Sequence, residues 1–467
     1  MSPEPSDALV FFGATGDLAY KKIFPALQAM VKRGNLNVPV VGVAKAGWNL
    51  DQLRARAKDS LEKHGGIDPA AYEKLCALLR YVDGDYQDPA TFEALRGQLK
   101  DAHRPSYYLA IPPVLFETVV ENVAKSNGAG GADGARVIVE KPFGHDLASA
   151  MELNKILLSI FDESSIFRID HFLGKRPVDN MCVFRFANSF AEAFWNRRYI
   201  ESVQITMAEN FGVQGRGAFY DGTGAIRDVV QNHLFQVLSN LAMEPPARSD
   251  GESLRDEKVK VLKSIPPIED KNLIRGQFQG YRSENGVAKD SQTETFAALQ
   301  LEINSWRWKG VPFFIRAGKC LPMTCTEILA KFRKPPTLLP DSVLTENHLR
   351  LRLSPDVVIA MGLMSLAPGE GMQLQAGEMV ATSSPGAGDM DAYERLLGAA
   401  MSGDNSLFAR EDYVEEAWRI VDPVLKKGTP VFPYAQNSWG PAEVAHVTPP
   451  GGWDVPVQGT ESLSGGG

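Results

Sequence analysis

The sequence predicts an α/β domain with a doubly wound parallel sheet, followed by a larger α+β domain built on a mainly antiparallel sheet. Two observations predict the first domain: short apolar runs alternate with helix-like segments, and a glycine-rich turn follows the first run. One observation predicts the second domain. After about residue 200, runs with strand-like alternation follow one another closely, with a single strong helix among them.

The first domain is expected to contain six strands separated by helices. Helical spacing is clearest at Ile23, Leu27, Met30 and Val31, which follow an i, i+4, i+7, i+8 pattern. Strands joined by helices form a parallel sheet, because parallel neighbours need crossover connections. The runs are apolar nearly throughout, as in a Rossmann domain whose sheet is covered on both faces. The expected strands are Ala8–Phe12, Val38–Val43, Leu79–Asp83, Ser106–Ala110, Arg136–Glu140 and Ile166–Asp170.

The second domain is predicted from one amphipathic helix and a set of alternating runs. The helix covers Ile226–Leu241 and carries Val230, Leu234 and Leu238 on its apolar stripe. Few helices separate the runs, which favours a large antiparallel or mixed sheet with a face that can pair with a second subunit. The runs are Val203–Met207, Thr293–Ile303, Pro312–Arg316, Leu349–Leu353 and Val357–Leu363.

The domain boundary is expected near residue 175. Residues 1–175 would form the Rossmann domain, and residues 176–467 would form the substrate and dimerisation domain. The tail from 449 to 467 is rich in glycine and proline, so we expect it to be mobile.

Composition and charge exclude several classes of protein. The formal net charge of -8 argues against bulk binding to nucleic acid or to a membrane surface. No run approaches the roughly 18 apolar residues of a membrane span, and the start MSPEPSDALVFFG has no basic n-region. The four cysteines form no C-x-x-C pair, so we expect no metal site, no disulfide framework and a cytoplasmic location.

A glycine-rich turn follows the first expected strand. Gly13, Gly16 and Ala19 match G-x-x-G-x-x-A, and glycine lets the backbone approach a pyrophosphate at a helix N-terminus. The sequence therefore predicts a dinucleotide cofactor here, although a turn that serves only packing remains an alternative. The expected cofactor-binding residues of this segment are Gly13, Thr15, Gly16, Asp17, Leu18 and Lys22.

The end of the second expected strand carries Lys45 in place of an acid. NAD-binding units usually place Asp or Glu there for the ribose hydroxyls, whereas a cation suits the 2′-phosphate of NADP. We therefore expect NADP to be favoured, with NAD use possible because lysine lacks the planar fork of arginine. An exposed lysine without a ligand is the alternative.

Charged residues follow the fifth and sixth expected strands, at the sheet edge where doubly wound folds bind ligands. Glu140 and Lys141 follow the fifth strand, and a lysine there can donate to a sugar hydroxyl or a carboxamide. Asp170, His171 and Lys175 follow the sixth strand. The acid can orient a base, and the two cations can hold an anion. A salt-bridged strand end is the alternative.

His233 lies beside the apolar stripe of the 226–241 helix, in the run RDVVQNH. A helical histidine of this kind is commonly a buried core residue. The oxidation of an alcohol, however, needs a base whose pKa lies near neutrality, which makes His233 a candidate catalyst.

Together these motifs resemble the glucose-6-phosphate dehydrogenase family over nearly the whole chain. The resemblance implies a Rossmann domain joined to an α+β domain, in a homodimer or homotetramer. It also implies oxidation of glucose 6-phosphate to 6-phosphogluconolactone with NADP, the first step of the oxidative pentose phosphate pathway. The runs that carry it are GATGDLA, EKPFG, RIDHFLGK, GVQGRGAFYDGTGAIRDVVQNH and VPFFIRAGK.

The resemblance implies a role for each site residue. His233 would take the proton from the anomeric hydroxyl, and Asp170 would pair with His233. His171 and Lys175 would bind the sugar phosphate. Further substrate contacts would come from Lys141, Glu209, Asp228 and Lys319, and further cofactor contacts from Lys45, Glu140 and Lys141.

Four places depart from the family pattern, one of them at Ala46 and Gly47 after Lys45, where relatives often carry a further Arg or Gln. Phe172 stands where Tyr is frequent, Arg176 replaces a usual Glu, and Thr324 occupies the place of a second basic residue. Two alternatives therefore remain open: a dehydrogenase of unphosphorylated or other hexoses, and a catalytically silent sensor of sugar phosphate or NADP. Glucose–fructose oxidoreductase-like enzymes share the EKP turn but lack the RIDHFLGK strand end.

Overall fold

The computed structural model describes residues 4–126, 134–336, 344–369, 372–383, 386 and 388–457. The chain forms two compact units. Unit 1 comprises Met1–Arg176, Pro246–Asp256 and Gly388–Glu415, and unit 2 comprises Pro177–Pro245, Glu257–Ala387 and Glu416–Gly467.

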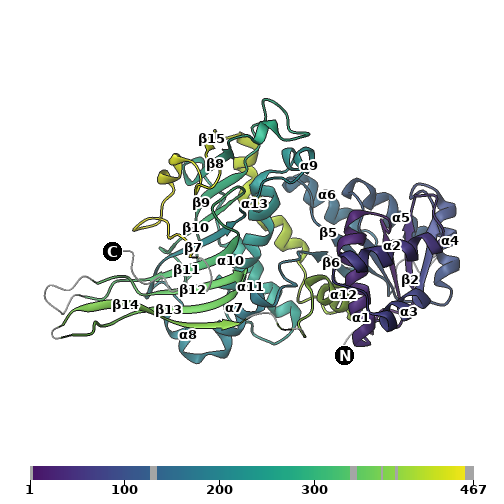
Figure 1. Ribbon diagram of the computed structural model, residues 1–467, viewed down its shortest axis with the longest axis horizontal. Coiled ribbons are helices and arrows are strands. Elements are labelled where there is room, and N and C mark those ends of the chain that lie inside the picture. The colour runs from purple at the N-terminus through teal and green to yellow at the C-terminus, as the bar shows by residue number, and fades with distance from the viewer. Residues whose placement is uncertain are drawn as a thin grey trace. The chain divides into compact units, whose positions relative to one another are not determined.

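Unit 1 is built on a six-stranded sheet with the order β3-β2-β1-β4-β5-β6, in which every pairing is parallel. Helices lie on both faces of this sheet (Figure 1). The predicted doubly wound Rossmann sheet is therefore confirmed. The strands are β1 Ala8–Phe12, β2 Val40–Ala44, β3 Leu79–Asp83, β4 Pro105–Leu109, β5 Arg136–Glu140 and β6 Ile166–Ile169.

Several helices of unit 1 begin at polar caps, and apolar side chains on its helices are buried against the sheet. Asn49 accepts from the Gln52 backbone, and Asp68 and Asp88 cap helices whose first residue is proline. Leu27 is fully buried, and burial of such a side chain stabilises the fold by about 1.5–3 kcal/mol. The segments are η1 Ala19–Ile23, α1 Phe24–Arg33, α2 Leu50–Lys63, α3 Pro69–Leu78, α4 Pro89–Leu99, η2 Pro113–Leu115, α5 Phe116–Ser126, α6 Leu147–Leu158, η4 Glu163–Ser165 and α12 Ala392–Ser402.

A late segment of the chain, Gly388–Glu415, packs into unit 1. The expected boundary at residue 175 had assigned this segment to the second domain. Leu396 and Leu397 of α12 are fully buried in the same core as Leu9 of β1. The rings of Phe167 and Phe408 meet edge to face at 5.0 Å. The apolar face of α12 thus completes a core that the first 175 residues leave open.

Unit 2 is built on a nine-stranded sheet with the order β14-β13-β12-β11-β7-β10-β9-β8-β15. The β7–β10 and β8–β15 pairs are parallel and the others are antiparallel, so the predicted mainly antiparallel sheet is confirmed. The strands are β7 Ile200–Ala208, β8 Leu273–Phe278, β9 Phe296–Glu302, β10 Pro312–Gly318, β11 Cys325–Phe332, β12 His348–Ser354, β13 Val357–Leu366, β14 Leu374–Ser383 and β15 Val431–Tyr434.

The helix expected over 226–241 is present but changes type along its length. Its first part, η5 (Ile226–Leu234), is a π-helix, and its second part, α10 (Phe235–Ala242), is a fully buried α-helix. π-Helical segments are rare, and those found within α-helices lie frequently at functional sites. The remaining helices are α7 Arg176–Ala187, α8 Ser189–Phe194, α9 Gly217–Asp221, α11 Gly251–Lys263, η6 Asp270–Asn272, η7 Tyr281–Ser283, α13 Glu411–Lys427 and η8 Ala442–His446.

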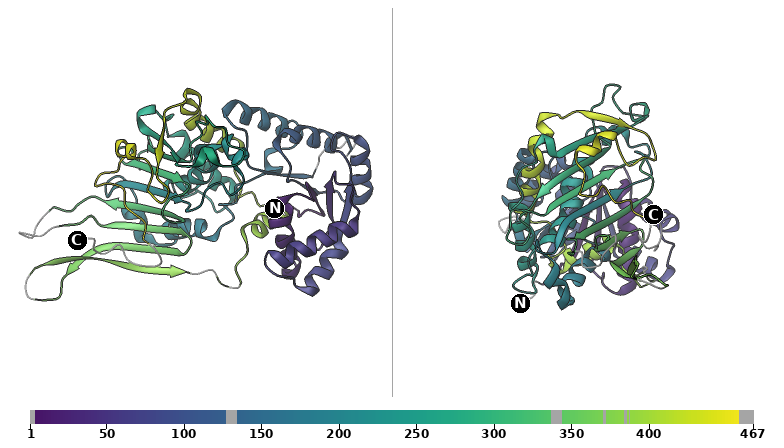
Figure 2. Two further views of the ribbon diagram at one scale, coloured as in Figure 1. Left: turned by 45° about the horizontal axis from the view of Figure 1, so that its top comes forward. Right: turned by 90° about the vertical axis from the view of Figure 1, so that its left-hand side faces the viewer.

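The first residues of the expected mobile tail are ordered against the sheet of unit 2. Asp454 pairs with Gln204 of β7 and with Lys331 of β11, while Arg316 of β10 donates to the Asp454 carbonyl. Figure 2 looks onto the broad face of this sheet in its right-hand view. The tail is therefore held as far as Val457, whose carbonyl accepts from Arg352; residues 458–467 lie outside the described residues.

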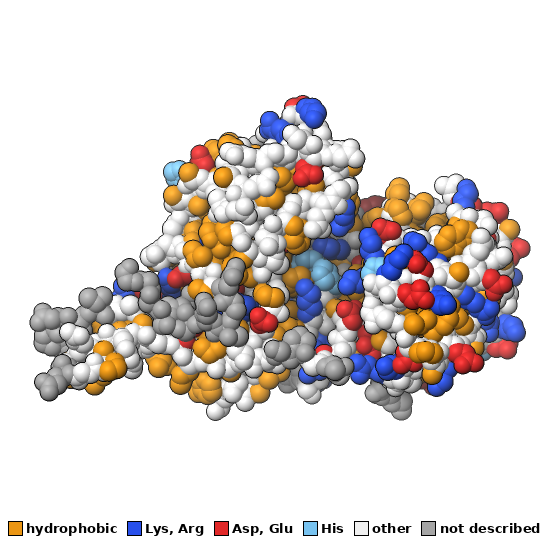
Figure 3. Space-filling view, viewed as in Figure 1, with side chains coloured by type: hydrophobic (Ala, Val, Ile, Leu, Met, Phe, Trp, Pro, Cys, Tyr) orange, Lys and Arg blue, Asp and Glu red, His pale blue; other side chains and the backbone are white. Residues whose placement is uncertain are grey.

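The distribution of surface charge and the state of the cysteines can be compared with the expectations from composition. Basic and acidic side chains are intermixed over the face of unit 1 seen in Figure 3. All four cysteines are free thiols. No helix in the described part of the chain is both long and apolar enough to cross a membrane.

Candidate functional site

The turn after β1 has a conformation that only glycine accommodates at its first position. Gly13 has a φ of 80°, and a Cβ there would lie 2.2 Å from the carbonyl oxygen of Ala110. The Gly16 N–H donates to the Gly13 carbonyl over 2.9 Å, which closes the turn directly before η1. Gly16 is exposed, so a ligand can approach the backbone at this point. The turn therefore fits a dinucleotide phosphate.

The remaining residues predicted for this turn surround that approach. Thr15 and Leu18 are half-buried, whereas Asp17 is exposed and forms an ion pair with Lys21 at 3.1 Å. Lys22 is exposed on η1.

A tyrosine from the loop after β3 also holds the turn, and the sequence analysis missed it. The Tyr86 hydroxyl accepts from the Gly13 N–H at 2.9 Å and lies 3.2 Å from the Val43 carbonyl oxygen. Its ring packs against Phe12 at 5.7 Å. A "DY" pair after a strand gives no recognisable signal in sequence, because the partner is a backbone N–H more than seventy residues earlier.

Lys45 follows β2, as predicted, but it is not isolated. Its Nζ lies 2.6 Å from Asp85 Oδ2, and this ion pair raises the pKa of Lys45 and lowers that of Asp85. Asp85 follows β3, the parallel neighbour of β2. Sequence analysis could not associate the two residues, because they are 40 positions apart.

Glu140 ends β5 in a cluster of tyrosines. Its carboxylate accepts a hydrogen bond from Tyr108 of β4 at 2.5 Å. Burial raises the pKa of Glu140 to about 7, although hydrogen bonds from Tyr108 and Tyr393 and the charge of Lys141 oppose this rise. Glu140 is thus a half-buried acid with a raised pKa at the end of β5, next to Lys141 in the sequence.

We expect the Glu140→Gln variant to change how stability depends on pH. Because the folded-state pKa is raised, the contribution of Glu140 is fully present below about pH 4 and is lost as pH rises through about 7. Between pH 5 and pH 8 the parent protein should therefore lose about 1–3 kcal/mol relative to the variant in urea unfolding. Glu73→Gln, at an exposed position of α3, is the control. Parallel pH curves for parent and Glu140→Gln would contradict this interpretation.

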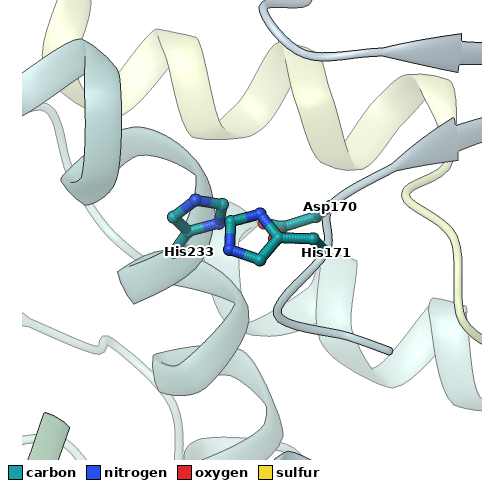
Figure 4. Close-up of side chains that lie close together, drawn as sticks. All are labelled: Asp170, His171 and His233. Atoms are coloured by element: carbon teal, nitrogen blue, oxygen red, sulfur yellow. The ribbon is translucent and has the colours of Figure 1, made fainter. Parts of the chain in front are cut away.

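The end of β6 orders the residues of the RIDHFLGK run. Asp170 is 2% exposed, and its Oδ1 accepts from the Phe172 N–H at 2.9 Å. Figure 4 shows Asp170 and His171 directly after this strand. Buried Arg168 ion-pairs with Glu163 at 2.7 Å behind the strand end. The strand end is therefore rigid where its functional side chains project.

Phe172 has a positioning role in this run. The Lys175 ammonium lies 3.8 Å from the centroid of the Phe172 ring, and the His171 ring meets the same aromatic at 5.3 Å. A cation over an aromatic face is attracted by the ring quadrupole. The ring thus holds Lys175 and His171 near each other. Exposed Arg176 lies 3.7 Å from Asp389.

Helix α12 fixes the turn between His171 and Lys175. Arg395 donates to the Gly174 carbonyl at 2.8 Å, and a Cβ on Gly174 would lie 2.7 Å from the carbonyl oxygen of Ala392. Glycine is thus required here by close packing, not by its backbone angle.

Unit 2 brings three predicted substrate residues together. Glu209, Asp228 and Lys319 line one small cavity of about 10 Å³. The Lys319 Nζ lies 2.5 Å from Glu209 Oε2, and Lys319 is only 8% exposed. Two carboxylates and one ammonium offer acceptors and a donor, the set that sugar hydroxyls require.

Tyr220 closes this cavity and was missed by the sequence analysis. Its hydroxyl is buried beside Asp228, so burial first and then the nearby carboxylates raise its pKa well above the usual value. The Lys319 ammonium lies 5.0 Å from the ring centroid. Tyr220 lies in the run GVQGRGAFYDGTGAIRDVVQNH, and its place in that motif is the sequence signal that could have identified it.

His233 projects from the helix η5 (Figure 4). Asp228 belongs to the same helix. His233 is 2% exposed. In an α-helix, residues five apart point about 140° away from each other, whereas the i→i+5 hydrogen bonds of a π-helix place them on one side. The π-helical form of η5 therefore lets Asp228 and His233 serve the same side of the helix.

Glu294 holds the start of η5, and nothing in the sequence indicated it. Its Oε1 accepts from the Ile226 N–H at 3.1 Å, and its Oε2 pairs with Arg275 at 2.7 Å. Gly224 is required just before the helix, because a Cβ there would lie 2.5 Å from Glu294 Oε1. A carboxylate at a helix N-terminus satisfies backbone donors and matches the helix dipole.

We expect Glu294→Gln to destabilise unit 2 by about 3–5 kcal/mol, because Arg275 would be left with a neutral partner in a buried setting. Urea unfolding of the variant measures this loss. Glu302→Gln is the matched control, since Glu302 is exposed and pairs with exposed Lys309. A loss below about 1 kcal/mol would show that the Glu294 pair does not hold the helix.

Two family models cover almost the whole chain. The model described as "Glucose-6-phosphate dehydrogenase, NAD binding domain" matches residues 10–180. The model described as "Glucose-6-phosphate dehydrogenase, C-terminal domain" matches residues 182–452. The chain belongs to the glucose-6-phosphate dehydrogenase family. The resemblance inferred from RIDHFLGK and RDVVQNH is thereby confirmed.

Members of the glucose-6-phosphate dehydrogenase family match this chain along nearly their full length. Glucose-6-phosphate 1-dehydrogenase 1 of Mycobacterium tuberculosis is 44% identical over 458 residues, 97% of each chain. The crystal structure of glucose-6-phosphate 1-dehydrogenase from Mycobacterium avium superposes with a TM-score of 0.91 at 44% identity, covering 98% of this chain and 100% of that one. A glucose-6-phosphate dehydrogenase in complex with glucose 6-phosphate superposes with a TM-score of 0.88 at 35% identity, covering 96% and 98%.

Proposed function

We propose that the protein oxidises glucose 6-phosphate to 6-phosphogluconolactone with NADP as the hydride acceptor. The observation that supports this most strongly is η5, which carries His233 and also supplies Asp228 to a cavity shared with Glu209 and Lys319. Membership of the glucose-6-phosphate dehydrogenase family supports the same substrate, as does the structure of a 35% identical relative in complex with glucose 6-phosphate.

The proposed reaction needs a base for one proton. The imidazole of His233 accepts the proton of the anomeric hydroxyl while the C1 hydrogen leaves as hydride, and the C1–O bond becomes the carbonyl of the lactone. In this proposal, the role of the Asp170 carboxylate is to stabilise the protonated imidazole during the reaction. An NADP bound at the turn after β1 supplies the hydride acceptor.

The charged residues of the RIDHFLGK run give the proposed specificity for a phosphorylated sugar. His171 and Lys175 donate charge-assisted hydrogen bonds to the phosphate, and Lys141 adds a further contact to the substrate or nicotinamide. Glu209, Asp228 and Lys319 bind the sugar hydroxyls. Glucose without phosphate would lack the first set of contacts.

The residues present fit a bound NADP. The turn at Gly13 and Gly16 has the glycine-only geometry that a close phosphate requires, and Lys45 follows β2 where an adenosine ribose binds in such folds. Thr15, Asp17 and Lys22 flank the turn.

The proposed reaction is tested with glucose 6-phosphate that carries deuterium at C1. Transfer of the label to the nicotinamide C4, followed by NMR of the reduced nucleotide, is the expected result. Label that stays in the sugar, or binding of both ligands without reduction, would contradict the proposal and favour a silent sensor. Assembly of the protein into a homodimer or homotetramer remains a prediction, and so does its cytoplasmic location.

A further inference from the structure

The carboxyl ends of β2 and β3 carry two acids in addition to the predicted lysine. Asp83 is the last residue of β3, and Asp85 lies two residues further on. Ala44 of β2 lies directly opposite Asp83 in the parallel pair, so both acids adjoin the loop that begins at Lys45.

Asp83 fixes the backbone of that loop. Its Oδ1 accepts the N–H groups of Ala46, Gly47 and Trp48 at 3.0, 2.8 and 3.2 Å. The next N–H, that of Asn49, donates to the side chain of Gln52. The backbone donors of the loop are therefore engaged, and the Lys45 ammonium is its charged donor for an incoming anion.

Asp85 holds that ammonium in a fixed position. Its Oδ2 lies 2.6 Å from Lys45 Nζ, while its Oδ1 accepts the Gln87 N–H at 3.0 Å. The Asp85 carbonyl also accepts from the Thr91 hydroxyl at 2.8 Å. The Lys45 and Asp85 side chains are 70% and 39% exposed, so a ligand can reach both of them.

We propose that Asp85 determines cofactor preference by reducing the advantage of NADP over NAD. A 2′-phosphate must compete with this carboxylate for Lys45 and is also repelled by it. The ribose 2′-hydroxyl of NAD, in contrast, can donate to Asp85, which supplies the acid that is absent from the end of β2. This inference rests on the proposed use of a nicotinamide dinucleotide.

The test compares Asp85→Asn with the parent protein by calorimetric titration with NADP⁺, NAD⁺ and 2′-AMP. Asparagine keeps the size of the side chain and the acceptor for the Gln87 N–H, so the loop retains its support. We expect the dissociation constants of NADP⁺ and 2′-AMP to fall by about 1.5- to fivefold, the range of exposed charge pairs, while that of NAD⁺ stays equal or rises.

Two further variants isolate the effect. In a Lys45→Gln background, Asp85→Asn should change NADP⁺ affinity less than it does in the parent, because the competition for the ammonium is gone. Glu121→Gln, which removes a carboxylate paired with Lys125 on α5, should leave both nucleotide affinities unchanged.

Unchanged or weaker binding of NADP⁺ to Asp85→Asn would overturn the inference. If that occurs while the parent protein still reduces NADP⁺ with glucose 6-phosphate, the role of Asp85 alone fails. If the parent binds neither nucleotide, both this inference and the proposed function fail.

Discussion

Replacement of His233 by asparagine is expected to lower kcat for glucose 6-phosphate oxidation by about 10²–10⁴-fold, the usual contribution of a positioned general base. Asparagine can occupy the space of the imidazole at a 2% exposed position but cannot accept the proton at neutral pH. The measurement is the initial rate of NADPH formation at saturating substrate.

A second histidine provides the control for this variant. His446 is exposed in η8, so His446→Asn should retain the kcat of the parent. Thermal unfolding shows whether His233→Asn is folded. A folded His233→Asn protein with near-parental turnover would remove His233 from the proposed mechanism.

Replacement of Lys175 by glutamine is expected to lower kcat/KM for glucose 6-phosphate by about 10–100-fold. A charged hydrogen bond contributes about 1.5–3 kcal/mol, and the position of Lys175 over the Phe172 ring preorganises this charge. With unphosphorylated glucose the variant should behave like the parent, because no phosphate is present to bind.

Lys155→Gln is the matched control, since Lys155 is exposed on α6 and its side chain is 80% accessible. An equal loss of kcat/KM with glucose and with glucose 6-phosphate would show that Lys175 supports the fold of the run and does not recognise phosphate.

The sheet of unit 1 was predictable because its strands are buried on both faces. A strand such as β1 reads as a continuous apolar run, and a parallel neighbour must be reached through a helix. The predicted β1, β3 and β5 have the observed bounds. Motifs at the ends of β1 and β6 were found for the same reason, since the fold places ligands at that edge.

Parts of unit 2 were not predictable from local pattern. Strand β11 has the sequence CTEILAKF and is buried along most of its length. Its polar and charged residues interrupt the apolar pattern by which a buried strand is recognised in a sequence. Buried Glu327 is paired there with Arg352 of β12 at 2.6 Å, a partner that only the sheet register brings close. Strands β8, β14 and β15 were also missed.

The supporting residues of the candidate site were missed for a related reason. Asp85 pairs with Lys45, and Glu294 holds the N-terminus of η5, across 40 and 68 residues of sequence. Sequence motifs identified the residues proposed for catalysis and binding. The side chains that position those residues are brought to them by tertiary contacts, which local sequence does not indicate.

The most direct test of the proposed function compares kcat/KM for glucose 6-phosphate and for glucose, with NADP as the acceptor. Because His171 and Lys175 are proposed to bind the phosphate, we predict a preference for glucose 6-phosphate of at least about 100-fold. Equal or greater kcat/KM with glucose would contradict the proposed function and favour a dehydrogenase of unphosphorylated hexoses.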